Sequence, residues 1–204
     1  EVMAGYDPKD LTSIDAPVPH YSQLINTSLE GLRIGLPKEF FSTDLDPQIR
    51  KILDTTLETL KTLGATLHDI SLPNSEICVP IYYILAPAEA SSNLARFDGV
   101  RYGYRCKDPV SLEDLYARTR GEGFGTEVKR RIIVGTHVLS SGSYNAYYQK
   151  AQKVRALIKH DFNKAFSQVD VVFAPTAPGT AFKLGEKVND PVTMYLSDIP
   201  QVQI

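Results

Sequence analysis

Residues 31–76 hold a short apolar segment, an amphipathic segment and a second apolar segment, in that order. The first apolar segment, 32–36, and the second, 65–72, are each followed by a proline, as is typical of buried strands. Between them, Asp46-Pro47 provides a helix N-cap and a first-turn proline, and Gly64 can end the helix. Two strands joined by one helix run parallel, with the helix covering the sheet. The sequence therefore predicts an α/β fold with a largely parallel sheet flanked by helices.

Beyond this βαβ unit the apolar pattern becomes helical. Pro80 and Pro87 interrupt the first helical stretch, 77–97, so this stretch is expected to be kinked or split. A loop is expected over 96–108, where charged residues alternate with aromatic residues and glycine. The remaining elements are predicted as helices over 112–120, 126–139 and 143–166 and a strand over 170–174.

Composition excludes several classes of protein. A formal net charge of −2 and a hydrophobic content of 43% are typical of a globular domain and unlike a strongly basic nucleic-acid binder. No apolar segment approaches the ~20 residues needed to span a membrane. Cys78 and Cys106 stand alone, without metal-ligand spacing, which favours a reducing, cytoplasmic location and no metal site.

Some residues have the composition of functional motifs without the required spacing. Segment 121–125 is glycine-rich but lacks the Lys-Ser/Thr of a phosphate loop, so a turn between helices is expected. Segment 140–143 is serine-rich but has no base at a fixed distance, so a turn that caps the following helix is expected. Four histidines share no common motif, so they are expected to be isolated surface or packing residues. They are His20, His68, His137 and His160.

Helix geometry separates the two arginines of segment 129–131. At about 100° per residue, Val128 and Ile132 lie about 40° apart and define an apolar face. Arg131 lies about 60° from Val128 and flanks this face, whereas Arg130 points away at about 200°. A partly buried arginine can hold a carboxylate through two parallel hydrogen bonds. Arg131 is therefore a candidate binding residue, and Arg130 is expected to be solvated.

Several segments carry a family resemblance that covers residues 1–199. They are Tyr82-Tyr83, 89–94, 96–103, 123–125, 127–132, 170–178 and 190–195. Together they resemble the amidase-signature family and, within it, the glutamine-hydrolysing subunits of tRNA-dependent amidotransferases. The resemblance implies an α/β/α sandwich around a mixed, largely parallel sheet.

In the family, a lysine and two serines perform the covalent chemistry, and the resemblance places them upstream of residue 1. The sequence also departs from the family pattern at 200–204. We therefore expect an interior fragment, inactive alone, with no catalytic residue in this chain. Residues 1–204 are expected to form one partial domain with a connector (1–30), the βαβ unit (31–76), a helical substrate-binding region (77–167), a strand and loop (168–199) and a divergent tail (200–204).

The resemblance implies three substrate-binding residues, Tyr82, Arg131 and Asp198. In these roles a guanidinium pairs with the α-carboxylate of glutamine, an aspartate pairs with its α-ammonium, and a phenol binds a polar group. Arg131 is also the arginine that helix geometry selects. Tyr83 points to another face of its helix and is expected in the core.

The resemblance further implies partners and cofactors outside this chain. The B and C subunits of the amidotransferase would use ATP and Mg to activate Glu-tRNA(Gln) and accept the ammonia. Two alternatives remain open at this point. One is an amidase-signature hydrolase acting on another amide, and the other is a non-catalytic module that binds RNA or protein through the lysine-bearing helix 143–166.

Overall fold

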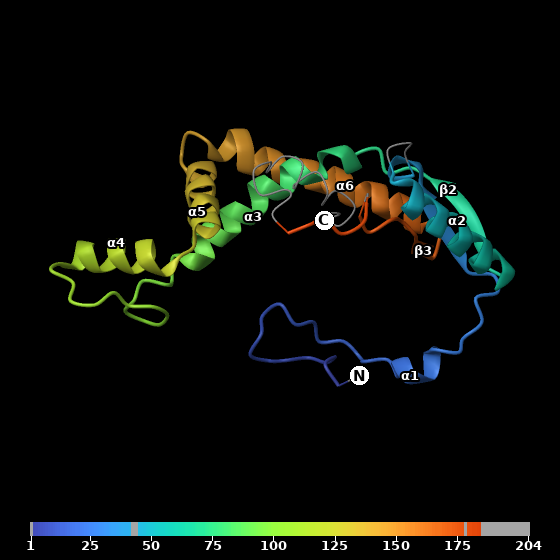
Figure 1. The fold of residues 1–204 in the computed structure, drawn as a ribbon, viewed down its shortest axis with the longest axis horizontal. Helices are drawn as coiled ribbons and strands as arrows, with labels where there is room; N and C mark the ends of the chain where they lie inside the picture. Colours follow the sequence, from blue (N-terminus) through green and yellow to red (C-terminus); the bar gives the residue numbers. More distant parts are fainter. Residues whose placement is uncertain (1, 42–44, 178, 185–204) are drawn as a thin grey trace.

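A three-stranded parallel sheet forms one end of the elongated molecule (Figure 1). The computed structural model describes residues 2–41, 45–177 and 179–184. The strands are β1 (Arg33–Pro37), β2 (Thr66–Ile70) and β3 (Val171–Val172), in the order β2-β1-β3. The predicted α/β fold and parallel strands are confirmed, although β3 is shorter than the predicted 170–174 because only two of its residues pair with β1.

The βαβ unit forms for the reasons that its sequence suggests. Helix α2 (Pro47–Thr62) begins at Asp46, whose carboxylate accepts a 2.7 Å hydrogen bond from the backbone N–H of Gln48. After the helix, Gly64 adopts a φ of +94°, and a Cβ there would lie 2.9 Å from the Cα of Glu30. Glycine therefore lets the chain turn closely past residue 30 into β2.

The middle of the molecule is helical. Its long helices are α3 (Cys78–Leu94), α5 (Thr126–Leu139) and α6 (Lys150–Phe166), and a π-helix, η3 (Tyr144–Gln149), leads directly into α6. The predicted helix 143–166 is therefore a π-helical turn followed by an α-helix. Shorter elements are α1 (Tyr21–Leu24), η1 (Lys38–Phe40) and η2 (Ser75–Ile77).

Segment 77–97 is expected to be kinked or split, and the split is wrong, because α3 is a single helix. Pro80 lies in the first turn, where backbone N–H groups have no acceptor within the helix, so its missing N–H costs little. Pro87 lies inside the helix and is buried, where packing against neighbouring helices stabilises the helical conformation.

Helix α6 contributes to two apolar clusters. Near its C-terminal end, Ala165 packs in a cluster with residues of the sheet end of the molecule, including Ile70 and Leu72. Near its N-terminal end, Ala151 packs with Ile81 and Leu85 of α3. The sheet and the helical region are thus built on one continuous helix.

Residues 96–124 form an arm that projects at the end of the molecule opposite the sheet (Figure 1). The arm contains a loop and α4 (Leu112–Gly123), which is longer than the predicted 112–120. Arg120 joins the arm to the end of α3, because its guanidinium donates to the backbone carbonyls of Leu94 at 2.8 Å and Phe97 at 3.2 Å.

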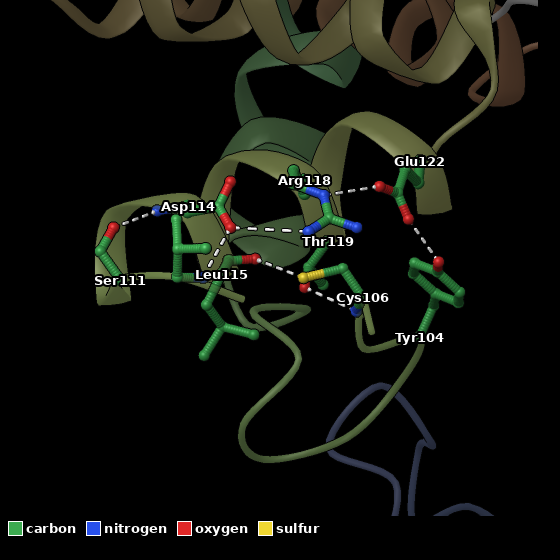
Figure 2. A network of polar contacts seen from close by, with 9 residues as sticks. Tyr104, Cys106, Ser111, Asp114, Leu115, Arg118, Thr119 and Glu122 are labelled. Atoms are coloured by element: carbon green, nitrogen blue, oxygen red, sulfur yellow. Dashed lines mark hydrogen bonds and ion pairs between the residues drawn. The ribbon is translucent and has the colours of Figure 1, made fainter. Parts of the chain in front are cut away.

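Polar contacts fasten the loop of the arm to α4 (Figure 2). The backbone N–H of Cys106 donates to the hydroxyl of Thr119 at 3.1 Å. The hydroxyl of Tyr104 donates to Glu122, which also accepts from Arg118 at 3.1 Å. These bonds lower the pKa of Glu122 and raise the pKa of Tyr104. The arm is therefore an ordered substructure with its own network.

The two expected turns have different outcomes. Within segment 121–125, residues 121–123 form the end of α4, so the connection between α4 and α5 is only the two residues Phe124 and Gly125 and is shorter than expected. Segment 140–143 is a turn, but the expected side-chain cap is wrong, because the Ser143 hydroxyl lies 3.3 Å from Nε2 of His137 and caps no helix. None of the helices in the described ranges is both long and apolar enough to cross a membrane.

Candidate substrate-recognition site

Arg131 on α5 and Tyr82 on α3 lie in direct contact, 49 residues apart in the chain. Nη1 of Arg131 donates to the hydroxyl oxygen of Tyr82 at 3.4 Å. The guanidinium carbon also lies 5.8 Å from the centre of the Tyr83 ring. With 33% of its side chain exposed, Arg131 is partly buried, as helix geometry predicts.

The carboxylate of Glu127 binds the Nε side of the Arg131 guanidinium. Nε of Arg131 donates to Oε1 of Glu127, one helical turn earlier on α5, at 3.0 Å. Hydrogen bonds with Tyr82 and Glu127 raise the pKa of Arg131 above its ordinary value, so the side chain stays cationic at every physiological pH.

Arg130 occupies the solvent side of the same carboxylate. Its Nη1 lies 2.6 Å from Oε2 of Glu127, and 57% of its side chain is exposed. The predicted difference between the two arginines is confirmed, since Arg131 faces α3 and Arg130 faces solvent.

A glycine on α5 brings the two helices together. A Cβ on Gly135 would collide with the carbonyl oxygen of Pro87 on α3, because the space left for it is far inside van der Waals contact. Gly135 follows Arg131 by one helical turn, so this close approach places Arg131 within reach of Tyr82. Only glycine allows the backbones to approach so closely.

Together these contacts describe a site suited to an anion. A guanidinium fixed on one edge and one face can hold a carboxylate with two hydrogen bonds. Within the described ranges, no three His, Cys, Asp or Glu side chains come together to hold a metal ion. The arrangement offers a partly buried cation whose geometry matches that of a carboxylate.

Comparison with protein families gives the context of the site. The model of the family named Amidase matches residues 1–202. The chain belongs to the amidase family.

Two curated amidase-family relatives are similar over nearly the whole chain. The A subunit of glutamyl-tRNA(Gln) amidotransferase from Thioalkalivibrio sulfidiphilus is 59% identical over 203 residues, which cover 100% of this chain and 42% of the relative. The corresponding A subunit from Alkalilimnicola ehrlichii is 58% identical over 197 residues, which cover 97% of this chain and 41% of the relative. The chain therefore spans less than half the length of these relatives.

Solved amidase structures share the fold. The A subunit of glutamyl-tRNA(Gln) amidotransferase from Thermotoga maritima matches with a TM-score of 0.69 and 36% identity, over 98% of this chain and 39% of that one. A bacterial aryl acylamidase of the amidase-signature family matches in fold alone, with a TM-score of 0.62 at 18% identity, over 98% of this chain and 40% of that one.

Of the three binding residues expected in this chain, the structure brings two together. Tyr82 and Arg131 are in contact, whereas Asp198 lies outside the described residues. The expectation that Tyr83 belongs to the core is wrong. Its ring is only partly buried, packs edge-to-face on Tyr82 and lies beneath the guanidinium of Arg131, because α5 crosses α3 on that side.

Sequence reasoning missed Glu127, although a signal was present. Glu127 and Arg131 are four residues apart on a predicted helix, the spacing at which opposite charges pair. By contrast, no feature of the local sequence indicates which helix supplies the partner at Nη1.

Proposed function

We propose that this chain is the glutamine-recognition part of the glutamine-hydrolysing subunit of a tRNA-dependent amidotransferase. The observation that carries the proposal is the contact between the partly buried guanidinium of Arg131 and the hydroxyl of Tyr82. Its support from comparison is the identity of 59% to the A subunit of a glutamyl-tRNA(Gln) amidotransferase.

In this proposal each residue has a distinct role. Arg131 binds the α-carboxylate of glutamine, since a guanidinium matches the geometry of a carboxylate. Tyr82 adds a hydroxyl that can donate to the same substrate while it accepts from Arg131. Asp198 pairs with the α-ammonium, which selects an amino acid over a simple amide.

The covalent steps belong to the rest of the amidase fold. There, one serine, activated by a lysine and a second serine, would attack the side-chain amide carbon and release ammonia, and water would then release glutamate from the acylated serine. The B and C subunits of a cytoplasmic heterotrimer would bind Glu-tRNA(Gln), activate it with ATP and Mg and accept that ammonia. This chain's contribution is to orient the substrate amide relative to the nucleophile.

The test uses the complete, assembled enzyme with glutamine or ammonium as the nitrogen donor. Arg131→Ala should lower kcat/KM for glutamine by a factor of roughly 30 to 1,000, the effect of losing a charged hydrogen-bond partner. Arg131→Lys should restore little, because an ammonium group lacks the planar fork. Amidation with ammonium should be unchanged, because ammonium bypasses the glutamine site.

Two controls sharpen this test. Arg130→Ala should stay close to wild type, because Arg130 is exposed and faces solvent. Hydrolysis of 4-aminobutanamide, which is glutamine without its α-carboxylate, should be equally slow in wild type and Arg131→Ala. If Arg131→Ala also loses ammonium-dependent activity, or slows both amides equally, the role assigned to Arg131 is wrong.

A further inference from the structure

We propose that Glu127 is a positioning residue that fixes Arg131 so that only the outer end of its guanidinium meets the substrate carboxylate. The proposal rests on the function proposed above and concerns how the same site is built. It follows from which atoms of Arg131 are already occupied.

The guanidinium carries one N–H on Nε and two N–H on each terminal nitrogen. The N–H of Nε is used by Glu127 at 3.0 Å, and one N–H of Nη1 points to Tyr82 at 3.4 Å. One face of the group lies over the ring of Tyr83. A carboxylate therefore binds end-on, between Nη1 and Nη2, and cannot use the side that includes Nε.

Glu127 can perform this role because it is itself held in place. Its second oxygen pairs with Arg130 at 2.6 Å, so both of its carboxylate oxygens have arginine partners. Because Arg130 is 57% exposed, its pair with Glu127 contributes little to the binding of a substrate carboxylate. The bond from Glu127 to Nε of Arg131 is the one that fixes the guanidinium.

A simpler role for Glu127 would be to stabilise α5. Acidic residues in the first turn of a helix interact favourably with its dipole, and Glu127 is such a residue. Helix α4 offers a matched control, because Glu113 also lies in a first turn and, within the described ranges, forms no hydrogen bond or ion pair with Tyr82 or Arg131. A helix-stabilising role predicts that the two substitutions act alike, and a positioning role predicts that they differ.

The experiment measures KM and kcat of the complete, assembled enzyme with glutamine and with ammonium. Glu127→Ala should raise KM for glutamine about tenfold, because the freed guanidinium must be ordered on binding. Its kcat with ammonium should not change. Glu127→Gln should restore most of the affinity, because its amide oxygen still accepts from Nε–H. Glu113→Ala should leave both parameters unchanged.

Other outcomes would overturn the inference. If Glu127→Ala leaves KM for glutamine unchanged or lowers it while Arg131→Ala raises it, Glu127 does not position Arg131, and the proposed function stands. If Arg131→Ala leaves KM for glutamine unchanged, the proposed function itself is wrong, and the inference about Glu127 is wrong with it. Equal effects of Glu127→Ala and Glu113→Ala on KM would assign Glu127 to helix stability alone.

Discussion

Gly135 of α5 lies directly on the backbone carbonyl of Pro87 in α3, where no side-chain carbon could fit. One helical turn earlier, the same face of α5 carries Arg131, and α3 carries Tyr82 between its first turn and Pro87. The close approach of the two backbones therefore sets the geometry of the contact between Tyr82 and Arg131.

Gly135→Ala should disturb both stability and glutamine use. The added methyl cannot fit beside a backbone oxygen, so α5 must move away from α3, at a cost of about 1–3 kcal/mol. Urea unfolding of the complete protein should show this loss, and KM for glutamine should rise. As a control, Gly121→Ala in α4 meets nothing within 4 Å and should stabilise the protein by about 0.5–1 kcal/mol. Equal stability of the two variants would contradict this account.

A pH-dependent ion pair fastens β3 beside β1. Asp170 binds the Arg33 guanidinium at 2.6 Å and the Arg33 backbone N–H at 2.9 Å, which lowers the pKa of Asp170 from 3.8 to about 2. Because the folded pKa is below the unfolded one, this contribution to stability is present above about pH 4 and is lost toward pH 2.

Asp170→Asn should remove that dependence. Unfolding midpoints of wild type and variant should differ at pH 7 and converge as the pH falls from about 4 to about 2. Arg33→Gln should behave in the same way, because it removes the partner of Asp170. A difference that persists at the acid end of this range would show that the Asp170 carboxylate contributes nothing through its charge.

The thiol of Cys78 should be nearly inert in the folded protein. Its side chain is fully buried, and burial raises its pKa from 9.0 to about 11, so at pH 8 the thiolate fraction falls about a hundredfold. Iodoacetamide labelling followed by peptide mass spectrometry should therefore find Cys78 unmodified until urea unfolds the protein. Labelling at equal rates with and without urea would refute its burial.

A polypeptide limited to residues 1–204 should release no ammonia from glutamine, because recognition residues cannot replace a nucleophile and its base. It should also self-associate as its concentration rises, since large apolar side chains such as Ile133 (70% exposed) and Leu157 (53% exposed) face solvent. Ammonia release that survives repurification, or a monomer at high concentration in sedimentation, would contradict these expectations.

Local signals explain why the βαβ unit could be predicted. The Asp46 cap, the helix and the turn at Gly64 are each determined within a few neighbouring residues. The split expected in α3 does not occur, because the effect of a proline depends on its position in the helix and on the packing around it. Pro80 lies in the first turn, where a missing N–H is harmless, and Pro87 is buried against α5.

The recognition site was predictable in part. Helix periodicity placed Arg131 beside an apolar face, and family resemblance paired it with Tyr82. Neither could reveal that Tyr83 also faces the guanidinium or that Gly135 permits the contact, because both depend on where α5 crosses α3. Crossing geometry depends on packing between distant segments, which a local pattern does not encode.

The arm of residues 96–124 lies in the sequence between the two helices that carry Tyr82 and Arg131. Its two ends lie close together, because Arg120 near its end bonds to the backbone at its start (Figure 1). Closing a chain segment costs entropy that grows only with the logarithm of its length, so doubling the arm would add only about 0.6 kcal/mol. An insertion in the outer loop of the arm should therefore cost little stability and leave the geometry of the contact between Tyr82 and Arg131 unchanged.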